Sequence, residues 1–193
     1  NARIIRNLIL GAEFLHSHIL HFYHLALPSF MRGPAMPPWT PGWEVDLRFT
    51  AADNQRLIDH YIQALAMRRQ AHEAGAIFGG KLPHTAAYEF GGVTSVPTAD
   101  NIIAFLWKLR ILQDFIDNVY IPDVLAVAGA YSDYFGIGVG CKNLLSYGTY
   151  DLEGKSPDYT RRNRLFKQGT VSADLKPSEL DTSKIAEYVK HSW

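Results

Sequence analysis

Apolar residues recur with gaps of three and four along the first 26 residues of the chain, a stretch that contains no proline and a single glycine. This periodicity predicts a helix over residues 3–26. Apolar positions also follow two further edges of that helix, so the polar strip is narrow: it consists of Arg6, Glu13, Ser17 and His24. A helix that is apolar almost all round is expected to be buried inside something larger.

Capping residues mark two further helices. Thr50 with Asp53 three residues later is a weak variant of the capping box, and it predicts a helix that runs to a glycine stop at Gly75. Thr98 predicts the start of a third helix with more than one apolar face. The proline-rich connection before Thr50 contains an alternating segment, residues 44–49, which predicts an edge strand.

The last third of the chain is less regular. Pro122 fits the first turn of a fourth helix, residues 169–174 predict a short strand, and residues 181–193 begin at a Ser/Thr/Asp cap and predict a last helix. The sequence therefore predicts a mainly α fold, a buried bundle of long helices with long irregular loops and minor short β segments. We expect a single helical region, residues 1–193, that is a fragment of a larger polypeptide, because the chain begins without methionine and stops inside a predicted helix.

Charge and cysteine content narrow the possible functions. Lys plus Arg and Asp plus Glu both number 19, which is unlike the basic surface of a nucleic-acid binder. The one cysteine, Cys141, excludes an internal disulfide and any site in which this chain alone supplies several thiolates. No apolar run reaches the length of a transmembrane segment. We therefore expect protein or small-molecule partners, no nucleic acid and no membrane span.

Four of the eight histidines lie in the segment "HSHILHFYHL". His18, His21 and His24 are three residues apart and turn by about 60° at each step, so at most two of them reach one ion. Glu13 and His16 form a Glu-x-x-His pair, but a di-iron bundle needs two such pairs and the chain has no second one. We interpret the histidines as hydrogen-bonded polar groups on a buried face.

Other candidate motifs are incomplete. The segment "GAIFGGKL" has the spacing of a phosphate-binding loop up to its lysine, but Leu82 replaces the magnesium-binding Ser or Thr, and a helix rather than a strand precedes it. Cys141 follows a glycine turn without an identifiable general base, which is typical of inert packing. The residues by themselves predict a helical scaffold without a complete active site.

Four segments carry a resemblance to a known family. The first helix, "IIRNLILGAEFLHSHILHFYHL", resembles a characteristic stretch of the large subunit of nickel–iron hydrogenases, and "HEAGAIFGGKLPH", "GGVT" and "NLLSYG" agree in order and spacing. The resemblance covers essentially the whole chain. It implies a heterodimeric enzyme that oxidises or forms dihydrogen at a nickel–iron centre with cyanide and carbonyl ligands, and that passes electrons to iron–sulfur clusters in a small subunit.

The family binds its metals through four thiolates from two Cys-x-x-Cys motifs, one near each end of the large subunit, and both motifs are missing here. The resemblance therefore implies a central scaffold segment that is inactive alone and depends on the remaining parts of the large subunit. It also implies a periplasmic location or membrane association through partners. No catalytic residue and no metal ligand are carried over to this chain.

The resemblance assigns a role to two histidines. It implies that His21, with His18 second, lies outside a small-subunit iron–sulfur cluster and hydrogen-bonds to it, which would raise the cluster's reduction potential. The family usually has an acid at the position of Ser17. Two other interpretations stay open: a structural subunit without the metal site, like the related subunit of respiratory complex I, and a stand-alone helical metal-binding bundle.

Overall fold

The computed structural model describes residues 2–42, 44–154, 156, 158 and 161–190. The chain folds into two compact units, residues 1–134 and residues 135–193. The first unit is mainly helical, and the second consists mainly of short strands and loops. This confirms a mainly α fold with minor β segments.

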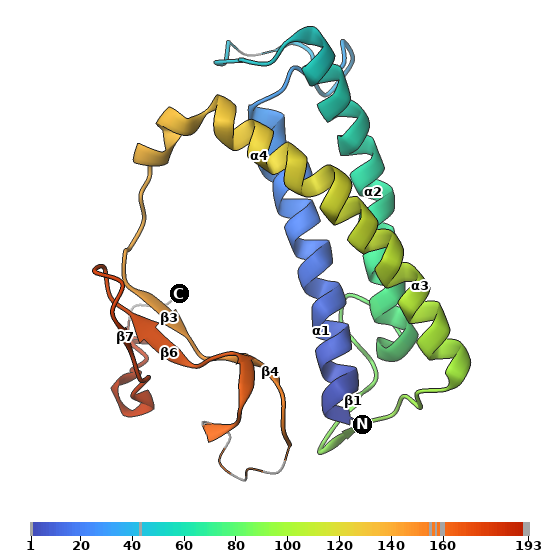
Figure 1. Cartoon of the computed structure of the whole chain (residues 1–193), viewed down its shortest axis with the longest axis vertical. Helices are drawn as coiled ribbons and strands as arrows, with labels where there is room; N and C mark the ends of the chain where they lie inside the picture. Colours follow the sequence, from blue (N-terminus) through green and yellow to red (C-terminus); the bar gives the residue numbers. More distant parts are fainter. Residues whose placement is uncertain (1, 43, 155, 157, 159–160, 191–193) are drawn as a thin grey trace. The chain divides into compact units, whose positions relative to one another are not determined.

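A first helical rod opens the first unit (Figure 1). It comprises α1 (Ala2–Ile19), a π-helical segment (Leu20–Ala26) and a short 3-10 turn (Leu27–Ser29). Pro28 lies in that last turn, where a missing backbone N–H ends the regular hydrogen bonding. The rod confirms the helix that the apolar periodicity predicts.

The second rod, α2 (Ala51–Gly79), packs along α1 in the opposite direction (Figure 1). Thr50 caps it by accepting a hydrogen bond from the backbone N–H of Asp53. The predicted stop at Gly75 is wrong, because the helix continues to Gly79 and ends at Gly80, whose φ of 76° favours glycine. A Cβ at Gly75 would lie 2.9 Å from Leu82, so this glycine permits close packing inside the helix.

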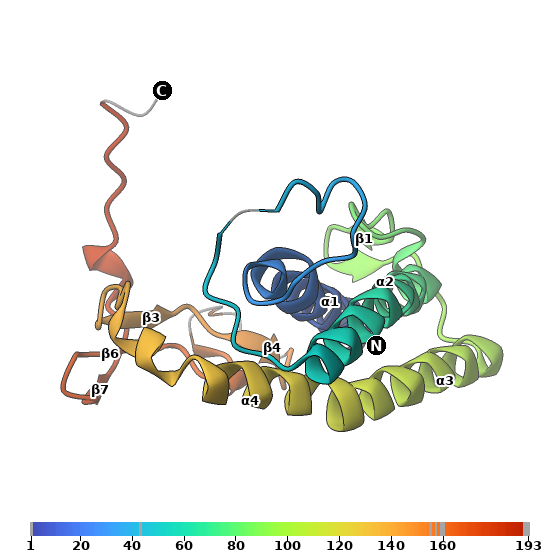
Figure 2. The ribbon, with the colours of Figure 1, turned by 90° about the horizontal axis from the view of Figure 1, so that it is seen from above.

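The third rod is continuous where the sequence predicts two helices (Figure 2). It comprises α3 (Ala99–Phe115), a π-helical segment (Ile116–Tyr120) and α4 (Ile121–Ala130). A proline inside a helix removes one hydrogen bond and crowds the carbonyl of the preceding turn. The π turn ends at Tyr120, two residues before Pro122, and the rod continues through the proline without a break.

Two apolar clusters form the core of the first unit. One surrounds the π segments and includes Ile19, Tyr23, Leu57, Leu112 and Phe115. The other lies where the start of α1 meets the end of α2 and the start of α3, and it includes Ile9, Phe78 and Phe105. A short hairpin, β1 (Tyr88–Glu89) with β2 (Gly92–Val93), lies in the loop between α2 and α3.

The second unit holds two small antiparallel sheets. They are a three-stranded sheet in the order β3-β6-β7 (Leu144–Ser146, Gly169–Val171, Pro177–Ser178) and the pair β4 (Thr149–Asp151) and β5 (Arg164–Phe166). The strand predicted within residues 169–174 is therefore confirmed. Arg164, which is buried, pairs with Asp151 through its Nε at 2.8 Å and links β5 to β4.

Two predicted elements are wrong. Residues 44–49 form no strand: Arg48 instead hydrogen-bonds to Asp46 and Asp133 and to the carbonyl of Ala130, which holds this segment to the end of α4. The predicted last helix is a single 3-10 turn, Thr182–Lys184, within the described part of the C-terminal segment, and residues 191–193 lie outside the described residues. Ile185, Tyr188 and Val189 would form one apolar face of such a helix, but all three are exposed, and a short helix is marginal without a packed face.

Candidate functional site: the histidine face of the first helix

One face of the first rod carries both histidines that the sequence singles out. Phe14, His18, His21 and Leu25 follow at intervals of four, three and four residues, so they share one face of the helix. All four are exposed; Leu25 keeps 64% of its surface accessible. The ring Nδ1 of His18 lies 2.8 Å from the carbonyl oxygen of Phe14, whereas His21 has no hydrogen-bond partner among the described residues. We name these four residues the histidine face; His21 and Leu25 are its exposed side chains on the π segment.

The other two histidines of the segment point to α2. His16 Nε2 lies 3.2–3.3 Å from the guanidinium of Arg68, and its ring packs 3.9 Å from the ring of His72. Burial, followed by the nearby His72 and Arg68, lowers the pKa of His16 to about 4. The ring is therefore neutral near pH 7 and accepts the hydrogen bond from Arg68.

His24 is half-buried beside α2. Its Nε2 donates to the carbonyl oxygen of Tyr61 at 3.2 Å, and its Nδ1 is buried without a partner among the described residues. Burial lowers the pKa of His24, and the hydrogen bond to Tyr61 offsets part of this effect. The expectation of four buried histidines therefore holds only in part, because His16 and His24 are partly enclosed while His18 and His21 are exposed.

A buried carboxylate lies behind the histidine face. Asp123 Oδ2 accepts a hydrogen bond from the hydroxyl of Tyr23 at 2.7 Å, and the same oxygen lies 2.7 Å from Nδ1 of His60. Burial and the hydrogen bond to Asp123 raise the pKa of Tyr23, so its proton stays on the phenol. The sequence did not predict this network. The available signal was Asp123, the one charged residue of the apolar helix α4.

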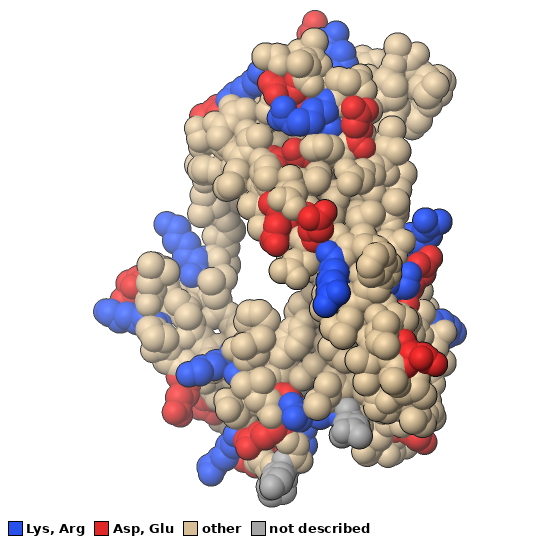
Figure 3. Space-filling model, turned by 45° about the vertical axis from the view of Figure 1, so that its right-hand side comes forward, with Lys and Arg blue, Asp and Glu red and all other residues tan. Residues whose placement is uncertain are grey.

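The first unit has a second exposed surface that is more strongly apolar. It lies on α3, where large side chains remain accessible: Ile102, Ile103, Leu106 and Trp107. Acidic and basic groups mix on the face seen in Figure 3, with wide uncharged areas between them. Ile102 and Leu106, like Ile103 and Trp107, are four residues apart, so these side chains lie on adjoining faces of α3.

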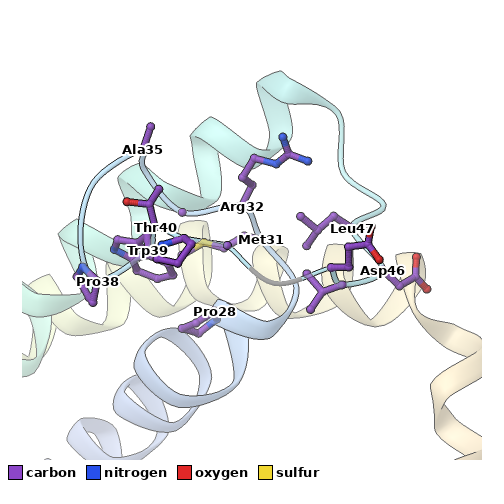
Figure 4. Close-up of a pocket in the computed structure, with 14 residues that line it drawn as sticks. Pro28, Met31, Arg32, Ala35, Pro38, Trp39, Thr40, Asp46 and Leu47 are labelled. Carbon is purple, nitrogen blue, oxygen red and sulfur yellow. The ribbon is translucent and has the colours of Figure 1, made fainter.

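The connection between α1 and α2 borders an open cavity of about 960 Å³, whose lining includes Pro28, Met31, Trp39 and Leu47 (Figure 4). Met31 lies beside Trp39 in it, whereas the charged ends of Arg32 and Asp46 point away from the indole. Asn54 holds the backbone of Arg32 through two hydrogen bonds.

Among the described residues, no three His, Cys, Asp or Glu side chains come together in a way that could hold a metal ion. Cys141 is an exposed, free thiol in the second unit. A centre that needs four thiolates does not fit the donors of this chain. The described residues thus form a helical scaffold with a histidine-bearing face and without a metal centre of its own.

Known proteins resemble this scaffold over its whole length. A family profile described as nickel-dependent hydrogenase matches residues 1–32 and 27–193. The large subunit of the periplasmic [NiFeSe] hydrogenase of Desulfomicrobium baculatum is 37% identical over 100% of this chain and 38% of the relative. An uptake hydrogenase large subunit of Azotobacter chroococcum mcd 1 is 29% identical, with 100% and 42% covered. The chain belongs to the nickel-dependent hydrogenase family.

Solved structures agree with this assignment. The Ni-Fe-Se hydrogenase of D. vulgaris Hildenborough superposes with a TM-score of 0.91 and 39% identity, covering 100% of this chain and 39% of that one. The corresponding enzyme of Desulfomicrobium baculatum gives a TM-score of 0.90. This chain spans about two fifths of the length of these relatives. None of the described helices is long and apolar enough to cross a membrane.

Proposed function

We propose that this chain is the central scaffold segment of a nickel–iron hydrogenase large subunit. The complete subunit would oxidise dihydrogen reversibly and pass electrons to iron–sulfur clusters of a small subunit. The observation that carries the proposal is the match of fold and sequence over the full chain, at 39% identity and a TM-score of 0.91. The scaffold segment is inactive alone, because the ligands of the nickel–iron centre, with its cyanide and carbonyl groups, come from parts of the subunit outside these residues.

The histidine face supports a second part of the proposal. His21 is exposed and has no hydrogen-bond partner among the described residues, so its ring N–H is available to another chain. We place this face against the small subunit, where His21 donates a hydrogen bond to the sulfur of the nearest cluster. A donor of this kind stabilises the reduced cluster and raises its potential. His18 contributes less, because the carbonyl of Phe14 engages one of its ring nitrogens.

The experiment that tests this role is His21→Ala in the complete heterodimer. We expect a lower midpoint potential of the nearest iron–sulfur cluster in a redox titration followed by EPR, with unchanged nickel content. His18→Ala is the matched comparison and should give a smaller shift. An unchanged potential in His21→Ala would refute the role of this residue.

Two alternatives receive less support. A stand-alone metal-binding bundle needs a cluster of ligands that the described residues do not show. A structural subunit without a metal site, like the complex I relative, is distinguished by the full gene, which would then lack Cys-x-x-Cys pairs on both sides of this segment. The periplasmic location of the relative from Desulfomicrobium baculatum supports the same location here.

A further inference from the structure

The buried carboxylate of Asp123 joins three helical segments of the first unit. Its side chain is 3% exposed, and it contacts Tyr23 from the first π segment and His60 from α2. Both hydrogen bonds are 2.7 Å long and end on the same oxygen, Oδ2. These two hydrogen bonds hold Tyr23 and His60 in place relative to α4, because losing either bond would leave a buried polar group without a partner.

The first π segment is held at one side and open at the other. Tyr23 is fully buried and bonded to Asp123, and the next residue, His24, donates to the carbonyl of Tyr61 on α2. His21 and Leu25 of the same segment are exposed. The side chains that anchor the segment therefore determine the direction in which His21 leaves it.

The π geometry of this segment bears on the direction of His21. A π turn closes its hydrogen bonds over five residues instead of four, so returning the segment to α-helical geometry would turn His21 and the residues after it about the helix axis relative to α1. The hydrogen bond from the Tyr23 hydroxyl to Asp123 ties the segment to α4.

We propose that Tyr23, Asp123 and His60 are positioning residues that hold the π segment Leu20–Ala26 so that His21 faces the redox group of the partner subunit. This inference rests on the proposed function. The network touches no reacting atom: it acts through the backbone of the segment that carries His21.

Tyr23→Phe in the complete heterodimer tests the proposal, because it removes one hydroxyl and keeps the packed ring. Tyr131→Phe is the matched control: Tyr131 is also buried, and its hydroxyl donates to the carbonyl of Asp46 at 2.7 Å, far from the π segment in sequence. His60→Gln retains a side-chain donor and should behave nearly as the wild type. The two readouts are the midpoint potential of the cluster nearest His21 and the amide hydrogen exchange of residues 20–26.

We expect Tyr23→Phe to shift the potential in the same direction as His21→Ala and to add no further shift in the double variant. It should also speed exchange at residues 20–26, whereas Tyr131→Phe should do neither. If His21→Ala shifts the potential and Tyr23→Phe does not, or if the two shifts add, the positioning role is refuted while the proposed function stands. If His21→Ala itself has no effect, the role of His21 fails, and unchanged exchange in Tyr23→Phe would also refute the anchoring.

Discussion

At the scale of single residues, the histidine-rich segment separates into two groups with different chemistry. His18 and His21 are exposed, whereas His16 and His24 are partly enclosed against α2. The sequence predicts the helix and the spacing, but it does not tell which of the four rings meets α2. That choice depends on residues far along the chain, such as Arg68 and Tyr61, which periodicity does not connect to the first helix.

His16 gives a prediction for the pH dependence of stability. Its pKa is about 4 in the folded chain and 6.5 as its ordinary value, so between these values the unfolded chain binds more protons. The free energy of unfolding should therefore fall as the pH drops from about 6.5 toward 4. His16→Gln retains an acceptor for Arg68 and removes this proton uptake, so the variant should lose less stability over that range.

The measurement is urea unfolding of the wild type and of His16→Gln at pH 7 and at pH 5. His18→Gln is the control, because it makes the same replacement on the exposed face of the same helix. Equal losses between the two pH values in the wild type and in His16→Gln would contradict the assignment of a neutral, enclosed ring.

At the scale of elements, helix starts are determined by local residues. Thr98 is the N-cap of α3, and its hydroxyl oxygen accepts a hydrogen bond from the backbone N–H of Asn101 at 3.2 Å. Thr50 acts in the same way for α2. Such caps involve three or four consecutive residues, so the sequence alone is sufficient to predict them.

Thr98→Ala tests the contribution of a cap. The free energy of unfolding should decrease by about 1 kcal/mol, because one backbone N–H at the start of α3 loses its acceptor. Thr98→Ser keeps the hydroxyl and should stay close to the wild type. A loss in Thr98→Ser as large as that in Thr98→Ala would show that the methyl group, rather than the cap, is responsible.

Helix ends and interruptions are less predictable from sequence for a physical reason. Gly75 is a plausible stop by its residue type, yet α2 passes through it because Leu82 packs against its bare backbone. Pro122 predicts the start of a new helix, but the third rod continues through this residue just after a π turn. Both outcomes depend on contacts or on a helical geometry that local propensity does not include. The Tyr23–Asp123–His60 network was not predicted for the same reason, since its members are up to 100 residues apart.

At the scale of the whole molecule, the chain forms two compact units, and the expectation of a single helical region over residues 1–193 stays a prediction. The first unit exposes two surfaces of different character: the histidine face of α1 and the apolar side chains of α3. The relatives that match the full chain are about two and a half times as long. Under the proposed function, the complete subunit and its partner would cover these surfaces.

The most direct test of the central claim is a combined mass and metal analysis. The polypeptide that contains this sequence would be purified from its natural source, and its intact mass and nickel content would be measured on the same sample. We predict a mass far above that of 193 residues together with nickel close to one atom per polypeptide, while the isolated 193-residue chain binds none. A mass equal to that of 193 residues without nickel, or stoichiometric nickel on the isolated chain, would contradict the assignment as a scaffold segment of a hydrogenase large subunit.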